Sequence, residues 1–152
     1  MNTDKILEDL KRQYSFDDRP WVVGFSGGKD STCTLQLIYE MLLSLSKKER
    51  KKTVHVLSSD TLVESPVISK RQRKICKMIS DAAQHDDIPL VVELLRPEIT
   101  DTFWVNLIGR GYPSPNKWFR WCTDRLKIKP MNKYILRHIK RNGEVLIILG
   151  AR

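Results

Sequence analysis

The chain has few cysteines and no long apolar run. Its 152 residues include only three cysteines, Cys33, Cys76 and Cys122, which are far apart and form no CxxC pair. Because the cysteines are odd in number and form no CxxC, neither a zinc ribbon nor a disulfide framework is supported. No apolar stretch approaches the roughly 18 residues that cross a bilayer. The first five residues carry no apolar core of the kind that signal peptides have. We therefore expect a cytoplasmic protein with no membrane partner.

Acidic residues are outnumbered. The chain has 27 Lys and Arg against 18 Asp and Glu, which gives a net charge of +9. Such an excess favours an anionic partner, although a basic soluble surface alone would also produce it. The most informative stretch is 117–129, where basic residues alternate with Trp118, Phe119 and Trp121. Cations for phosphate and rings for stacking suit single-stranded or flipped nucleotides, although the two tryptophans would equally suit a core.

The chain has no internal repeat, and its apolar periodicity alternates between the helical and the strand type. Strands are expected at 21–25, 53–59, 89–95 and 144–149. Helices are expected between residues 2–3 and 17–20, at 31–46, from 65–66 onward, at 98–109 and at 130–141. This alternation predicts an α/β fold with a parallel sheet and helices on both faces. In such sheets ligands bind beyond the carboxyl ends of the strands.

The loop after the first predicted strand, Phe-Ser-Gly-Gly-Lys-Asp-Ser at 25–31, lies at that edge. Gly27 and Gly28 let backbone N–H groups approach an anion, and the helix that follows adds its positive N-terminal end. Lys29 supplies a full charge, and Asp30 suits a magnesium ion that bridges phosphate oxygens. The spacing is neither that of a Walker A loop nor GxGxxG. An ordinary Gly-Gly turn before a capped helix is the alternative.

Residues 26–31 resemble the PP-loop of the ATP-pyrophosphatase (adenine nucleotide α-hydrolase-like) superfamily, which has a Rossmann-like fold. These proteins hold ATP so that its α-phosphorus is attacked and pyrophosphate leaves. The resemblance implies ATP and Mg²⁺ as ligands, with Lys29 and Asp30 as catalytic residues and Asp30 at the metal. Residues 60 and 61, followed by Glu64, resemble the family's second-strand ending, where a strand-end turn is the alternative reading of Asp60. The implied nucleotide contacts are Ser26, Gly27, Gly28, Lys29, Asp30, Ser31, Asp60 and Thr61.

Residues 109–115 (GRGYPSP) and 118–130 (WFRWCTDRLKIKP) resemble the phosphoadenosine phosphosulfate (PAPS) reductase-like branch of this superfamily. Within that branch they are most similar to DndC-type sulfurtransferases, which replace a non-bridging oxygen of a DNA phosphate by sulfur. The resemblance covers the chain from about residue 21 to its end. It implies DNA as substrate, a cysteine desulfurase as sulfur donor and further subunits of a DNA phosphorothioation complex as partners. The expected substrate-binding residues are Arg120, Arg125, Lys127 and Lys129, with a plain basic face as the alternative for the lysines.

The three cysteines are expected to differ in role. Cys122 lies between Arg120 and Arg125, and a cationic setting favours the thiolate that carries or attacks sulfur. We therefore expect Cys122 to be catalytic, with packing beneath the neighbouring tryptophans as the alternative. Cys33 and Cys76 lie on apolar helix faces and are expected in the core.

The chain departs from the family pattern in one respect. Family members carry a four-iron four-sulfur cluster on cysteines beyond the nucleotide domain, and this chain has no such group. Because it stops directly after a predicted strand, we expect a fragment with an incomplete sheet. Its parts would be an N-terminal helix over 1–20 and a C-terminally truncated PP-loop domain over 21–152. Three other functions stay open: a PAPS-type reductase acting on a sulfonucleotide, a non-catalytic nucleic-acid-binding module and a tRNA-thiolating enzyme.

Overall fold

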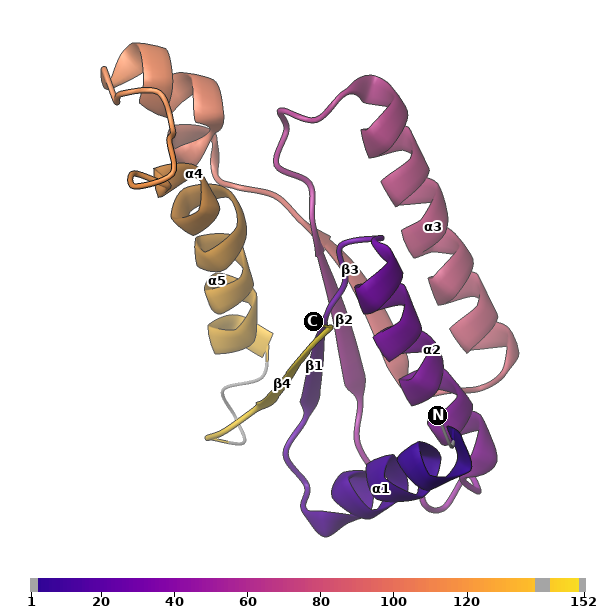
Figure 1. Cartoon of the computed structure of the whole chain (residues 1–152). Coiled ribbons are helices and arrows are strands. Elements are labelled where there is room, and N and C mark those ends of the chain that lie inside the picture. Colours follow the sequence, from indigo (N-terminus) through magenta and orange to yellow (C-terminus); the bar gives the residue numbers. More distant parts are fainter. Residues whose placement is uncertain (1–2, 139–142, 151–152) are drawn as a thin grey trace.

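The strands form one parallel sheet. The computed structural model describes residues 3–138 and 143–150, and the sheet has the strand order β3-β2-β1-β4 (Figure 1). All three neighbouring pairs are parallel, with Trp21 opposite both Val54 and Leu146. The strands are β1 (Trp21–Gly24), β2 (Val54–Ser59), β3 (Leu90–Leu95) and β4 (Leu146–Leu149). The predicted α/β fold with a Rossmann-like parallel sheet is confirmed.

Helices cover both faces of this sheet (Figure 1). Successive side chains of a strand point to opposite faces, so Val23 packs toward α2 and α3 while Val22 packs toward α5. On the α5 side, Val22 and Leu57 contact Met131 and Ile135. The long helices are α1 (Thr3–Phe16), α2 (Lys29–Ser44), α3 (Pro66–His85) and α5 (Lys129–His138). In the part of the chain that the structure describes, no helix is both long and apolar enough to cross a bilayer.

Helix α1 belongs to the same core as the sheet. Tyr14 is buried, and its hydroxyl donates a hydrogen bond to the Lys52 carbonyl at 2.7 Å. The Lys52 ammonium lies 4.9 Å from the centre of the Tyr14 ring and 5.3 Å from that of Trp21. It also donates to the Asp17 carbonyl at 2.9 Å. This buried cation also pairs with Asp17 Oδ1 at 3.3 Å, so two rings, a carbonyl and a carboxylate satisfy it and tie α1 to the starts of β1 and β2.

Two of the expected helices are wrong in extent. Residues 98–109 are not one helix: a short 3₁₀ turn, η1 (Ile99–Asp101), is followed after Thr102 by a helical segment over 103–109 that consists mostly of π-helix, η2 (Val105–Gly109). The next helix begins at Trp121 rather than Pro130, running through α4 (Trp121–Thr123) and η3 (Asp124–Ile128) into α5. Pro130 is tolerated because η3 is a wider π-type turn, so the clash that proline makes in a regular helix is relieved. The expected continuation over 139–141 lies outside the described residues.

The strand order places a crevice at one end of the sheet. From β1 the chain adds β2 and then β3 on one side, and β4 is added on the other side of β1. The order therefore reverses between β1 and β4. A crevice opens at the carboxyl ends of two strands where such a reversal occurs, and ligands of open α/β sheets bind there.

Candidate functional site

A cavity of about 570 Å³ occupies this position. Its volume is that of a small-molecule site. The walls come from the ends of β1, β2 and β4, from the loop after β1, and from α3, η3 and α5. Apolar side chains line much of it, and its polar lining residues are Ser26, Ser31, Ser59, Glu64, Arg71, Gln72 and Lys127.

The glycine-rich loop forms one wall and is braced internally. Gly27 has a φ of +72°, a left-handed conformation that favours glycine. Ser31 Oγ donates to the Gly28 carbonyl at 3.0 Å and lies 3.0 Å from Ser26 Oγ. Helix α2 starts directly after Gly28, and no side chain caps it. The loop therefore presents the positive end of α2 to the cavity, although the Gly28 N–H already donates to Ser26 Oγ at 3.4 Å.

Lys29 and Asp30 lie at the start of α2 but do not line the cavity. Lys29 Nζ donates to Asp30 Oδ1 at 2.6 Å, and both side chains are substantially exposed. The structure thus brings Ser26, Gly27 and Ser31 into the cavity wall. The two charged residues are joined to each other beside it.

The side chains at this site suit a magnesium ion but do not suit an iron–sulfur cluster. Mg²⁺ needs only one or two carboxylates when phosphate oxygens complete its shell; Glu64 lines the cavity, and Asp30 lies beside it at the start of α2, paired with Lys29. Over residues 3–138 and 143–150, no group of three or more His, Cys, Asp or Glu could hold a metal by itself. An iron–sulfur cluster requires a group of cysteines, and the three cysteines of this chain do not form one.

Asp60 and Thr61 shape a turn after β2 instead of lining the cavity. Asp60 is buried, and its Oδ2 accepts from Arg73 Nη2 at 3.2 Å and Arg96 Nε at 3.1 Å. Thr61 Oγ1 donates to Glu64 Oε1 at 3.4 Å. Asp60 and Thr61 therefore affect the cavity indirectly, because they stabilise the turn that places Glu64 in its wall.

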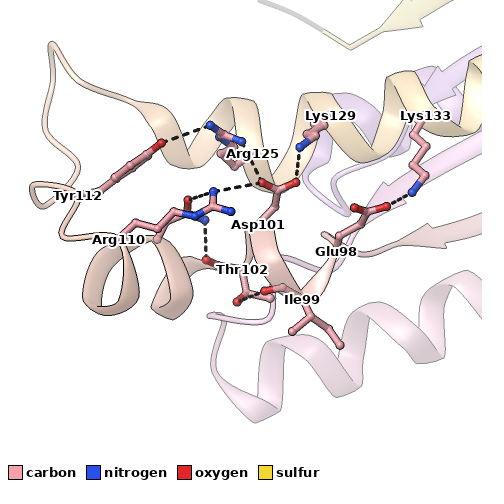
Figure 2. Close-up of polar contacts among 10 residues, drawn as sticks. Glu98, Ile99, Asp101, Thr102, Arg110, Tyr112, Arg125, Lys129 and Lys133 are labelled. Atoms are coloured by element: carbon pink, nitrogen blue, oxygen red, sulfur yellow. Dashed lines mark hydrogen bonds and ion pairs between the residues drawn. The ribbon is translucent and has the colours of Figure 1, made fainter.

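Two of the four expected substrate-binding cations are tied to a buried carboxylate. Figure 2 shows Arg110, Arg125 and Lys129 converging on Asp101, which lies in η1 and is 3% exposed. Arg125 Nη1 donates to Asp101 at 2.9 Å, and Lys129 donates to its other oxygen. Hydrogen bonding from Lys129, followed by that from Arg125, lowers the pKa of Asp101. Arg125 and Lys129 thus hold the segment after β3 against η3 and α5.

Two cations line the cavity and have no acidic partner among the described residues. These are Lys127, from η3, and Arg71, from α3. Lys127 was expected from the sequence. Arg71 was missed because it lies in a helical stretch rich in basic residues, which reads as a solvated face. A usable signal was its spacing from Ile68 and Ile75, since residues three and four apart share one side of a helix.

The cysteines and tryptophans of the expected site separate into buried and exposed groups. Cys76 is buried, and burial raises the pKa of its thiol, whereas the expectation that Cys33 is a core residue is wrong because it is exposed. Cys122 is half-buried and does not line the cavity. Trp121 is buried and stacks on Phe103, with ring centres 5.3 Å apart. The neighbouring Arg120 is exposed.

Gly150, directly after β4, was not anticipated from the sequence as a site residue. It lines the cavity and lies against the backbone at the start of α2. A Cβ at this position would come within 2.7 Å of the carbonyl carbon and oxygen of Asp30 and 2.8 Å of the Ser31 nitrogen. Only glycine allows this approach of two backbones.

Comparison with known proteins gives relatives without a described function. No known protein-family model matches the chain. It is 29% identical over 143 residues to an uncharacterized protein of Methanocaldococcus jannaschii, covering 94% of this chain and 25% of that protein. It is also 29% identical over 152 residues to an uncharacterized nin region protein of Escherichia phage lambda, covering 86% of this chain and 47% of the relative. The chain therefore spans about a quarter and about half the length of these two curated relatives.

Proposed function

We propose that this chain is the nucleotide-binding part of an ATP pyrophosphatase and that ATP binds in the cavity between β1 and β4. One observation carries the proposal: the braced loop 26–31 ends at the uncapped N-terminus of α2 and forms a wall of a 570 Å³ cavity at the switch point of the sheet. A helix N-terminus and glycine amides together favour phosphate. The likeness of residues 26–31 to the PP-loop supports ATP as the nucleotide.

The described residues suggest how charge on the phosphates would be balanced. The loop amides and the N-terminus of α2 receive the departing pyrophosphate, and Lys29 turns from Asp30 toward it. Asp30, with Glu64 nearby, would hold Mg²⁺, which neutralises charge on the phosphate oxygens when bound. Arg71 and Lys127 stabilise the charge that develops around the α-phosphorus from other walls of the cavity.

The proposed acceptor is a phosphate of the DNA backbone, on the likeness of residues 109–115 and 118–130 to DndC-type sulfurtransferases. A non-bridging oxygen attacks the α-phosphorus of ATP and pyrophosphate leaves. Persulfide sulfur, supplied by a cysteine desulfurase, then attacks the activated DNA phosphorus, and AMP leaves with the original oxygen. A thiol finally reduces the remaining S–S bond. Cys122 is the proposed sulfur carrier, further subunits of the complex are proposed partners, and no step is assigned to an iron–sulfur cluster.

Replacing Lys29 tests the nucleotide site. We expect Lys29→Ala to weaken ATP binding in the presence of magnesium about tenfold, because a hydrogen bond to a charged group contributes about 1.5–3 kcal/mol. Titration calorimetry measures the affinity, and pyrophosphate release reports on turnover. Lys70→Ala is the matched control, since Lys70 is exposed on α3 and does not line the cavity. Folded wild-type chain that takes up no ATP would refute the proposal. A non-catalytic nucleic-acid-binding module would be favoured if Lys29→Ala left nucleic-acid binding intact, charge reversal at Lys127 and Lys129 abolished it, and the wild type released no pyrophosphate.

A second pair of variants tests whether Lys127 binds the ligand while Lys129 stabilises the fold. Lys127→Met should weaken ATP binding about tenfold and leave the thermal midpoint unchanged, because Lys127 lines the cavity without an acidic partner among the described residues. Lys129→Met should lower the thermal midpoint instead, because it removes a counterion of the buried Asp101. Calorimetry and thermal unfolding of both variants give the comparison. Exchanged phenotypes would mean that the two lysines have been assigned the wrong way round.

A further inference from the structure

Trp118 is the most exposed of the large apolar side chains that the structure describes. It is 91% exposed, whereas Trp121, three residues later, is 7% exposed. The two rings that the sequence left equivalent therefore have different roles. Trp121 is part of a small core with Phe103, and its indole N–H donates to the Pro113 carbonyl at 3.0 Å. Trp118 makes no such contact and presents its ring to solvent.

The segment that carries Trp118 is held in one conformation by its own hydrogen bonds. Asn116 Oδ1 accepts from the backbone N–H groups of Trp118 and Phe119, both at 2.9 Å. The Asn116 N–H in turn donates to the Phe119 carbonyl at 3.1 Å. Trp121 anchors the other end of the turn in the buried core. The backbone that carries the ring is therefore already ordered before a ligand covers it, which lowers the entropic cost of binding.

The surroundings of the ring are positive. Lys117 Nζ lies 5.9 Å from the centre of the Trp118 ring, and Arg120 follows two residues later. Neither cation has an acidic partner among the described residues, and the sequence from Arg110 to Thr123 contains no acidic residue. Acidic side chains of a protein partner could pair with these cations, but they would leave the exposed ring without a flat partner. A polyanion with flat, stackable rings would satisfy both features.

We propose that Trp118 stacks on an unpaired nucleobase, with Lys117 and Arg120 binding the flanking phosphates of a single-stranded or locally opened DNA. The inference rests on the DNA acceptor proposed above and adds the form in which the DNA is bound. Stacking on an aromatic side chain requires a base outside the duplex, and it tolerates any base because each has a π-face. The region lies at the same end of the sheet as the start of α2 (Figure 1), so one strand could reach the cavity from it.

Fluorescence anisotropy with a labelled single-stranded thymidine oligonucleotide and a fully paired hairpin tests this site. Trp118→Ala should weaken binding of the single strand about tenfold, and Trp118→Phe should restore most of it. Lys117→Ala should reduce the dependence of affinity on salt, whereas Trp118→Ala should leave that dependence unchanged. Phe16→Ala is the matched control, because Phe16 is an exposed aromatic on α1 toward the opposite end of the sheet (Figure 1). We expect it to bind as the wild type does.

Several results would overturn the proposal, and each can be distinguished from a failure of the proposed ATP site. Equal affinity of wild type and Trp118→Ala for the single strand would overturn it, as would hairpin binding with the same dependence on Trp118. A variant that changes only self-association of the chain would mark a protein-binding surface instead. No binding of either DNA would refute both this inference and the DNA acceptor. ATP titration of Trp118→Ala should match the wild type, so the nucleotide site is judged separately.

Discussion

Replacing Gly150 with alanine should lower the affinity for ATP about hundredfold. The new Cβ would lie 2.7 Å from the carbonyl group of Asp30, which is backbone and cannot rotate away. Relief requires the end of β4 or the start of α2 to move, and both border the cavity. A displacement of about 1 Å at a reactive site can cost about hundredfold in rate, and we expect a loss of similar size in ATP affinity because the loop amides would no longer meet the phosphates. Titration calorimetry with magnesium present measures the effect.

A second glycine provides the control for this variant. A Cβ on Gly109 would meet only the Val105 side chain, at 3.9 Å, and Gly109 lies far along the chain from both β4 and α2. Gly109→Ala should therefore bind ATP as the wild type does. Circular dichroism of Gly150→Ala distinguishes a local shift from a loss of fold. Wild-type affinity in a folded Gly150→Ala would show that the contact between β4 and α2 does not set the geometry of the site.

The second large effect is expected at Asp101. Asp101→Asn removes the charge that compensates Arg125 and Lys129 (Figure 2). Breaking a buried ion pair from one side costs about 3–5 kcal/mol. Because the two cations are partly exposed, we expect about 2–3 kcal/mol, measured by urea unfolding at pH 7. Glu98→Gln is the control, since its pair with Lys133 is exposed on both sides and should contribute little.

The difference in unfolding free energy between the wild type and Asp101→Asn should depend on pH in a defined way. The pKa of Asp101 is lower in the folded chain than its usual value, so its stabilisation is present above the unfolded pKa of about 3.9 and disappears as the pH falls through the folded value. The pKa of Asp17, lowered to about 2 chiefly by hydrogen bonding from Arg19, predicts a further loss between about pH 4 and pH 2. Wild type and Asp101→Asn should therefore converge in stability in acid. A difference that stays constant down to pH 2 would contradict the assignment.

The sheet and its loop could be predicted because they depend on local patterns. Buried parallel strands are short apolar runs, and 21–25, 53–59 and 89–95 match β1, β2 and β3 within a residue or two. The glycine-rich loop follows β1 as expected, and Ser65 caps α3 with Pro66 in its first turn. At 98–109 the apolar spacing resembled one helix, but the segment is interrupted at Thr102, where Asp101 is held by Arg125 from η3 and the Thr102 carbonyl accepts from Asn106.

The roles of the charged residues could not be predicted, because pairing across the fold decides them. Lys127 and Lys129 are two positions apart and chemically alike, yet one lines the cavity and the other binds Asp101. Asp60 resembled a nucleotide contact in the sequence, but Arg73 and Arg96, far along the chain, converge on its carboxylate. The role of Gly150 could not be predicted either, because nothing near it in the sequence indicates that it lies against the backbone of Asp30.

The position of β4 has a consequence for the order in which the cavity is completed during translation. The first strand pairs with the last of the described elements, so Leu149 and Gly150 leave the ribosome after every other residue of the cavity wall. Until these two residues emerge, the glycine-rich loop can form its internal hydrogen bonds, but the cavity lacks the wall that the end of β4 provides. Nascent chains therefore carry an open half-site, and under the proposed function a nucleotide would be enclosed only once β4 docks.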